Sequence, residues 1–161
     1  MKKLVLIAGL PGVGKSTLAR KVARENNGLV LDLDDFKKLV VDPKLVTTQI
    51  DPPKIRWVYY EKAITHAFSL EVEVVVMDEV FHLHALRTQL EDLCLQHGVK
   101  VEWIEVCCTY QVVEKRLNQK SREGHILSTE EALRMYQLFQ EIFERFPEGK
   151  ENHIVVDNND D

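Results

Sequence analysis

Eight residues near the N-terminus, from Gly9 to Ser16, carry the clearest chemistry in the sequence. They read Gly-Leu-Pro-Gly-Val-Gly-Lys-Ser and fit the pattern G-x-x-x-x-G-K-[ST] between an apolar run and a segment of helical period. Glycines let the backbone curl and aim its N–H groups at phosphate oxygens, and the next helix adds its positive dipole end. Lys15 can reach the β- and γ-phosphates, and the Ser16 hydroxyl can ligate Mg²⁺. The motif predicts a binding site for a nucleoside triphosphate, which we take to be ATP.

Two other interpretations of these glycines explain less. A plain turn between a strand and a helix requires neither Lys15 nor Ser16, and a dinucleotide-binding loop would have a third glycine where this chain has Thr17. We therefore expect ATP to contact Gly9, Pro11, Gly12, Val13, Gly14, Lys15, Ser16 and Thr17.

A carboxylate follows a second apolar run, Val74 to Met77. Asp78 then has the form of a Walker B residue, which lies beside the phosphates and holds Mg²⁺ directly or through water. An aspartate after a buried strand can also cap a helix, but the phosphate-binding motif upstream favours the metal. We expect Ser16 and Asp78 to be the metal ligands. Glu79 has two interpretations, a solvated side chain or a group that orients attacking water.

Three further carboxylates, Asp32, Asp34 and Asp35, follow the apolar residues 29–31. They lie where ligands bind in an open α/β sheet, at the carboxyl end of a strand. Because phosphoryl transfer to a hydroxyl can use a base, Asp34 or Asp35 is a candidate general base. The alternative is that one of them caps a short helix from Phe36.

The hydropathy pattern supplies the elements that must position these residues. Short apolar runs predict strands at Leu4–Ala8, Leu29–Leu33, Val72–Met77, Val99–Cys107 and His153–Val156. Segments of helical period predict helices at Lys15–Asn26, Pro53–Leu70, His82–His97, Tyr110–Lys120 and Thr129–Phe146, the last with a capping box at Ser128. Continuous apolar runs suit strands buried on both faces, so we expect an α/β fold with a five-stranded parallel sheet flanked by helices. The strand bearing Asp78 should pair with the one before the phosphate-binding motif.

Three segments resist regular structure. We expect loops at Val41–Pro53 and Ser121–Ser128, and a frayed, solvated end at Asn158–Asp161.

Length and composition limit the other possibilities. A chain of 161 residues predicts one domain, 1–161, and a net charge of −5 gives no overall basic field for nucleic acid. Three cysteines without a CxxC pair suggest a reducing compartment, and we expect Cys107 and Cys108 to be core residues. No apolar run approaches the roughly 20 residues that span a bilayer, so we expect a cytoplasmic protein without a membrane partner.

Several of these segments together resemble a known family. The phosphate-binding motif continued to Arg20, the run Asp34-Asp-Phe-Lys37, the run Arg116-x-Asn-x-Lys-x-Arg122-x-Gly124 and Ala132–Tyr136 are similar to the kinase domain of polynucleotide 5′-hydroxyl kinases, within the wider group of small P-loop kinases. The resemblance implies that Asp34 is the base. It also implies that lid arginines meet the triphosphate and that Lys37, where the family usually has Arg, contacts the acceptor.

The lid and the acceptor side complete the expected site. Arg122, at the start of a small lid over 121–128, is the expected catalytic arginine, and Arg116 and Arg122 should contact ATP. Arg56 precedes Trp57, Tyr59 and Tyr60, whose rings either stack on a base or fill the core. The expected acceptor contacts are Asp34, Asp35, Lys37 and Arg56.

The reaction expected from these residues is transfer of the γ-phosphate of ATP to a hydroxyl, with Lys15, Asp34 and Arg122 as catalytic residues. The acceptor favoured by the resemblance is the 5′-hydroxyl end of DNA or RNA. A nucleoside, sugar or antibiotic is the alternative acceptor. An ATPase switch or a nucleotide-binding module without catalysis is the alternative of another class.

Overall fold

A parallel sheet of five strands forms the centre of the computed structural model, which describes residues 2–45, 50–119 and 128–159. The strands lie in the order β2-β3-β1-β4-β5, and every neighbouring pair is parallel. Their bounds are β1 Lys3–Ala8, β2 Leu29–Leu31, β3 Val74–Glu79, β4 Lys100–Cys107 and β5 His153–Asp157. The predicted fold class and the predicted pairing of β3 with β1 are both confirmed.

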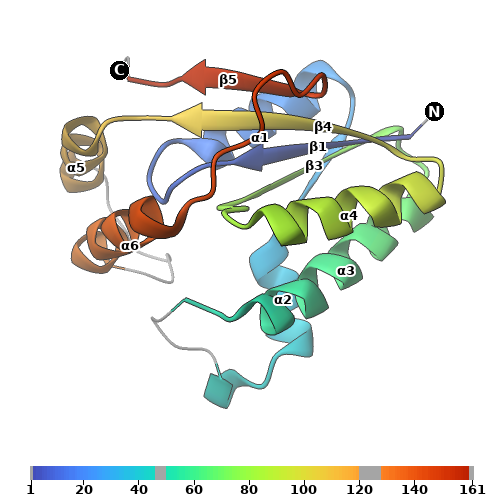
Figure 1. Ribbon diagram of the computed structural model, residues 1–161, viewed down its shortest axis with the longest axis horizontal. Coiled ribbons are helices and arrows are strands. Elements are labelled where there is room, and N and C mark those ends of the chain that lie inside the picture. The colour runs from blue at the N-terminus through green and yellow to red at the C-terminus, as the bar shows by residue number, and fades with distance from the viewer. Residues whose placement is uncertain (1, 46–49, 120–127, 160–161) are drawn as a thin grey trace.

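Helices cover both faces of this sheet (Figure 1). They are α1 Lys15–Glu25, α2 Leu33–Val40, α3 Pro53–Ser69, α4 His84–Gln96, α5 Tyr110–Gln119 and α6 Thr129–Ile142, with a 3₁₀ turn at Pro43–Leu45. Within the described residues, none of them is long and apolar enough to cross a membrane.

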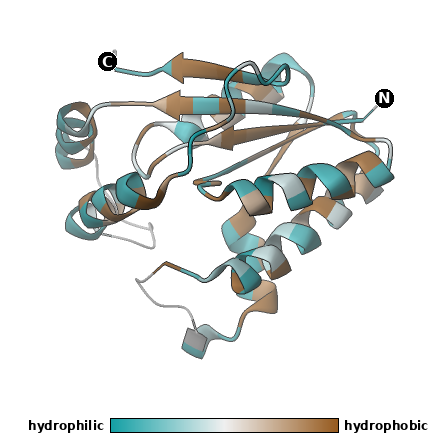
Figure 2. Cartoon of the chain, viewed as in Figure 1, coloured by the Kyte–Doolittle hydropathy of each residue, from teal (hydrophilic) through white to brown (hydrophobic). Residues whose placement is uncertain are grey.

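The central strand β1 shows why both faces are covered. Leu4 and Leu6 belong to one apolar cluster with side chains of α3 and α4, whereas Val5 and Ile7 belong to a second cluster with α1, α5 and α6. Successive side chains of a strand point to opposite faces, so an uninterrupted apolar run needs a cover on each side. Figure 2 shows largely apolar strands between helices in which polar and apolar residues alternate.

The second strand is shorter than predicted because a helix begins earlier. The predicted strand 29–33 ends at Leu31, and α2 starts at Leu33 instead of Phe36. The cap of α2 is Asp32, whose carboxylate accepts a hydrogen bond from the Asp34 N–H at 2.9 Å. Neither Asp34 nor Asp35 is therefore the cap, and both lie in the first helical turn.

The last long helix also differs from the prediction. The Ser128 cap is confirmed, since its side chain accepts from the Glu131 N–H, but α6 ends at Ile142 instead of Phe146. Phe146 leaves the helix to fill the core, where its ring stacks on His153 at 4.2 Å and lies 5.4 Å from Trp103. Similarly, α4 begins at His84 and not at His82, which is buried.

Two predictions for the ends of β4 and β5 are wrong. The predicted frayed end begins at Asn158, but Asn158 is hydrogen-bonded through its backbone to the Cys107 carbonyl and through its side chain to Val13, so it is not frayed. Asp160 and Asp161, the last residues of that prediction, lie outside the described residues. Cys107 is exposed at the end of β4, while Cys108 is buried as expected.

Replacing Phe146 with Ala should lower the free energy of unfolding by about 3 kcal/mol, because the variant leaves a cavity against Trp103 and His153. Urea denaturation followed by tryptophan fluorescence measures this. Leu95→Ala is the control, since Leu95 is 78% exposed and its loss should change stability by no more than about 0.5 kcal/mol. Equal effects of the two substitutions would show that Phe146 is not part of the core.

Candidate active site

The carboxyl ends of the parallel strands bring the predicted site residues to one edge of the sheet. In the register of β1 and β3, Ile7 pairs with Asp78 and Ala8 with Glu79. The residues that follow Ala8 form the phosphate-binding loop, residues 9–16, so this loop begins beside the two carboxylates. Strand β2, on the other side of β3, ends at Leu31 next to Met77 and leads to α2. The phosphate-binding loop, the start of α2 and the end of β3 are thus neighbours in space, although α2 follows the loop by about 20 positions and the end of β3 by about 60.

The phosphate-binding loop is tightly fitted against α5. Gly12 has a φ of +83°, and a Cβ added to it would lie 2.7 Å from a methyl group of Val113. Both the left-handed backbone and the close approach require glycine at this position. Val13 is buried in the same cluster as Val113 and Leu117. The predicted ATP-contacting residues of the loop therefore form one compact, well-supported turn.

Lys15 lies inside this turn. Its ammonium donates hydrogen bonds to the carbonyls of Gly9 at 2.8 Å and Leu10 at 2.9 Å. Burial lowers the pKa of Lys15, whereas the negative charges of Asp78, Glu79 and Asp34 act in the opposite direction. A half-buried cation between these groups is suited to attract a further anion, and phosphate oxygens would offer it stronger acceptors than carbonyls.

Ser16 and Asp78, the predicted metal ligands, lie together. The Ser16 hydroxyl donates to the Asp78 carboxylate at 3.2 Å. Burial raises the pKa of Asp78, and Lys15 opposes that rise. Among the described residues there is no group of three or more His, Cys, Asp or Glu side chains that could hold a metal ion. A hydroxyl and one carboxylate fit a Mg²⁺ ion that takes its remaining ligands from phosphates and water, as this ion usually does.

Asp34 is exposed in the first turn of α2, and its surroundings disfavour its charge. Loss of hydration beside the sheet edge, together with the negative charges of Glu79 and Asp32, raises the pKa of Asp34 to about 6. Lys37 and Lys38 act in the opposite direction. A carboxylate with a pKa in this range is ionised at neutral pH and remains basic enough to take a proton in a reaction. Asp35, the other candidate base, is exposed in the same turn.

The two cations expected to contact an acceptor are already paired. Lys37 forms an ion pair with Asp51 at 2.5 Å, and the Tyr59 hydroxyl donates to the same carboxylate at 3.2 Å. Arg56 donates from Nε to the Asp51 carbonyl at 3.1 Å and lies 3.9 Å from the Glu79 carboxylate. We call these five residues the acceptor-side network. It joins α2, the segment before α3, α3 itself and the end of β3 into one charge-compensated unit.

Burial decides between the two interpretations of the aromatic residues in α3. Tyr59 is 1% and Tyr60 0% exposed, and their rings meet edge to face at 5.3 Å. The Tyr60 hydroxyl accepts a hydrogen bond from Arg56 at 3.3 Å. Both rings are core residues, and neither can stack on a base from solvent. Trp57 is half-buried and donates its indole N–H to Glu61 at 3.1 Å.

The predicted lid lies almost entirely outside the described residues. Arg122 and the rest of 121–127 belong to that part, and only Ser128, the cap of α6, is described. Arg116, in the last turn of α5, donates to the Cys108 sulfur at 3.6 Å. The described helices on either side of this segment, α5 and α6, both pack against the cluster that holds Val13 of the phosphate-binding loop.

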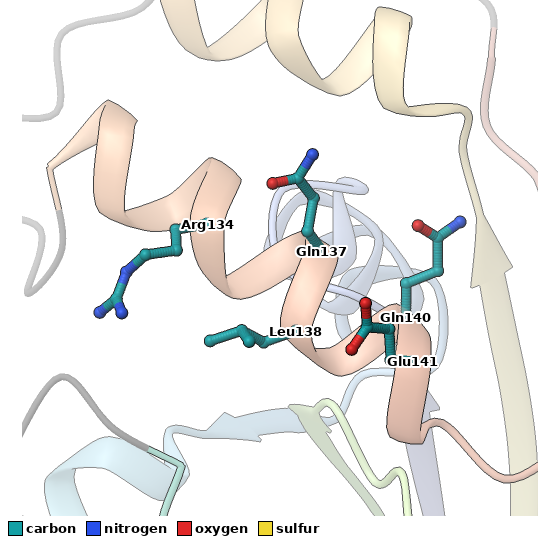
Figure 3. Close-up of a pocket in the computed structure, with 5 residues that line it drawn as sticks. All are labelled: Arg134, Gln137, Leu138, Gln140 and Glu141. Carbon is teal, nitrogen blue, oxygen red and sulfur yellow. The ribbon is translucent and has the colours of Figure 1, made fainter.

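A shallow hollow also occurs on α6, lined by Arg134, Gln137, Leu138, Gln140 and Glu141 (Figure 3). All five side chains come from the one helix, and none belongs to the predicted site. This hollow is therefore separate from the phosphate-binding loop and the carboxylates.

Two residues of the site region were missed by sequence reasoning. Asp51 holds Lys37 and the α3 segment in place, and Asn158 contacts the phosphate-binding loop. Neither belongs to a motif. The only local signal for Asp51 is its place before Pro52 and Pro53, which predicts a turn and not a charge partner.

Several solved structures with the same fold are kinases. A gluconokinase from Sinorhizobium meliloti superposes with a TM-score of 0.74 at 17% identity, covering 99% of this chain and 84% of its own. A sugar kinase from Janibacter sp. gives 0.70 at 20% identity, with 98% and 86% covered. The APS kinase of Mycobacterium tuberculosis, solved with AMPPNP and APS, gives 0.63 at 18% identity, with 96% and 88% covered. At these identities the likeness establishes the fold.

A family assignment comes from the sequence itself. Residues 4–157, nearly the whole chain, match the family described as AAA domain. The match extends from β1 through the phosphate-binding loop and Asp78 to the last residue of β5. The chain belongs to this AAA domain family and has the fold of P-loop kinases.

Proposed function

We propose that this protein is an ATP-dependent kinase that phosphorylates a hydroxyl of a small polyhydroxylated molecule. The observation that carries the proposal is the position of Asp34 in the first turn of α2, at the carboxyl end of the sheet, where its pKa is raised to about 6 and its charge acts on Lys15 of the phosphate-binding loop. A base near the γ-phosphate position can activate a hydroxyl acceptor for phosphoryl transfer. The gluconokinase and the sugar kinase that share the fold act, by name, on small molecules of this kind.

Each step of the proposed phosphoryl transfer can be assigned to residues of this chain. Backbone N–H groups of the phosphate-binding loop and the Lys15 ammonium would hold the β- and γ-phosphates. Asp34 would take the proton from the acceptor hydroxyl while the hydroxyl oxygen bonds to the γ-phosphorus, and the bond from the γ-phosphorus to the bridging oxygen breaks with its electron pair leaving on ADP. Ser16 and Asp78 would hold Mg²⁺, which when bound neutralises charge on the phosphates. Arg116 and Arg122 would contact the triphosphate from the lid side.

The charges on the acceptor side favour a small molecule over a nucleic-acid end. Lys37 and Arg56, the cations expected to meet a polynucleotide, are compensated by Asp51 and Glu79. The exposed residues Asp32, Asp34 and Asp35 lie at the cap and in the first turn of α2, just after the carboxyl end of β2. Carboxylates accept hydrogen bonds from hydroxyl groups and repel phosphates, so the acceptor side suits a polyol better than a chain of phosphodiesters.

The position of Glu79 argues against a hydrolytic motor. Its carboxylate accepts from the Val80 N–H at 2.8 Å and pairs with Arg56, so it is engaged in holding α3. A glutamate that orients attacking water would need that carboxylate turned to the γ-phosphate.

The acceptor can be identified with γ-labelled ATP and three groups of compounds: sugars, sugar acids and other polyols; nucleosides; and oligonucleotides with 5′-hydroxyl ends. We expect transfer to a member of the first group. Asp34→Asn should lower turnover roughly 10²–10⁴-fold because an amide cannot take the proton, and Asp35→Asn is the matched control with a smaller loss. Transfer to oligonucleotide ends alone, or hydrolysis at the same rate without any acceptor, would refute the proposal.

The pH dependence of kcat/KM should report the same base. With Asp34 as the base, kcat/KM for the acceptor should fall tenfold per pH unit below about pH 6, because the protonated carboxyl cannot accept a proton. In Asp34→Asn the residual kcat/KM should lose this acidic limb. An unchanged limb in the variant would assign it to another group.

The stability of the fold should fall with rising pH, whereas kcat/KM should rise. The pKa of Asp34 is about 6 in the folded protein and about 3.8 in the unfolded chain, so its ionisation weakens the fold as pH rises through 6. Asp34→Asn removes that charge, and its Tm relative to the parent protein should be higher at pH 8 than at pH 4. Thermal unfolding without nucleotide measures both values. The same Tm difference at both pH values would show that the Asp34 carboxylate is not destabilised in the fold.

A further inference from the structure

Asn158, the residue after β5, lies against the phosphate-binding loop although 145 positions separate it from Val13. Its side-chain amide donates to the Val13 carbonyl at 2.8 Å. Its backbone N–H donates to the Cys107 carbonyl at 2.8 Å, which continues the pairing of β5 with β4. The Asn158 backbone is therefore fixed at the end of the sheet, and its side chain contacts the loop.

The peptide that Asn158 holds is the one between Val13 and Gly14. The described part of the chain has no cis peptide bond, so the carbonyl and the N–H of this peptide point in opposite directions. An amide that fixes the Val13 carbonyl on the outer side of the loop therefore fixes the Gly14 N–H on the inner side. That N–H belongs to the backbone donors that a phosphate-binding loop aims at its ligand.

Gly14 is shaped to receive Asn158. Its φ is +97°, and a Cβ added to it would lie 2.5 Å from the Asn158 side-chain nitrogen. Any side chain at position 14 would thus displace the amide that holds the loop, in addition to straining the backbone. The glycine of the motif and the asparagine after β5 fit as a pair.

A second asparagine keeps this contact in place. The Asn159 side-chain oxygen accepts from the Thr109 N–H at 2.8 Å, just before α5, and its backbone N–H donates to the Asp157 carboxylate at 3.1 Å. Asn158 and Asn159 therefore connect the end of β5 to the start of α5 as well as to the loop.

We propose that Asn158 is a positioning residue for the phosphate-binding loop, one that holds the Val13–Gly14 peptide with its N–H facing the bound triphosphate. This rests on the proposed function only in that the loop binds a triphosphate, and it does not depend on the acceptor. Losing the contact should weaken triphosphate binding about tenfold, the equivalent of one hydrogen bond.

The test compares Asn158→Ala, which removes the amide, with Asn158→Leu, which keeps a side chain of similar size without a donor. Calorimetric titration with tripolyphosphate and with a non-hydrolysable ATP analogue gives the affinities. We expect both variants to bind both ligands about tenfold more weakly than the parent. The matched control is Asn152→Ala at the other end of β5, where Asn152 donates to the Val101 carbonyl at 3.1 Å, and its affinities should equal those of the parent.

Other affinities of the Asn158 variants would overturn the proposal. Parent-like affinity in both variants would show that the contact does not position the loop, and parent-like affinity in Asn158→Leu alone would reduce its role to packing. A loss confined to the ATP analogue would mean that Asn158 acts on the nucleoside and not on the loop. A parent protein that binds both ligands but phosphorylates no acceptor would refute the proposed kinase function and leave this inference intact. A parent that binds neither would refute both.

Discussion

The parallel pairing of β1 between β3 and β4 is the constraint on which the site depends. Parallel strands in register end at one edge of the sheet. The pairing of β1 with β3 alone therefore makes the phosphate-binding loop after Ala8 a neighbour of the Asp78 carboxylate. The apolar side chains of β1 stabilise this arrangement from both faces, since Leu6 and Ile7 belong to different clusters. The covering helices are needed to bury the sheet and also to carry side chains to its edge.

That edge concentrates negative charge, and the surrounding structure compensates it. Glu79 and Asp51 are paired with Arg56 and Lys37, while Lys15 lies among the carboxylates of the loop side. Isolated buried charges would be costly, and pairing lets the fold keep several of them at close range. At Asp34, loss of hydration and the charges of Glu79 and Asp32 outweigh Lys37 and Lys38 and raise the pKa to about 6. Burial also raises the pKa of Asp78, which accepts a hydrogen bond from Ser16. The fold thus holds some carboxylates in ion pairs and leaves Asp34 disfavoured as an anion and suited to take a proton.

Local signals predicted much of this protein, and the errors have a common cause. The loop motif, the five strands and the Ser128 cap are encoded by neighbouring residues, and each is found close to its predicted place. The end of α6, the buried rings of Tyr59 and Tyr60 and the role of Asp51 depend on distant partners instead. Propensity favours helix through position 146, but burial of Phe146 against Trp103 outweighs it.

The sequence by itself determined the class of ligand and the architecture, because a phosphate-binding loop and apolar runs are written in consecutive residues. Only the tertiary structure decided which charges remain available at the site. The ion pair of Lys37 with Asp51 and the contact of Asn158 with Val13 are predicted by no local pattern. Ion pairs and loop supports join residues far apart in the chain, and their energies depend on distance and burial, which no local pattern contains.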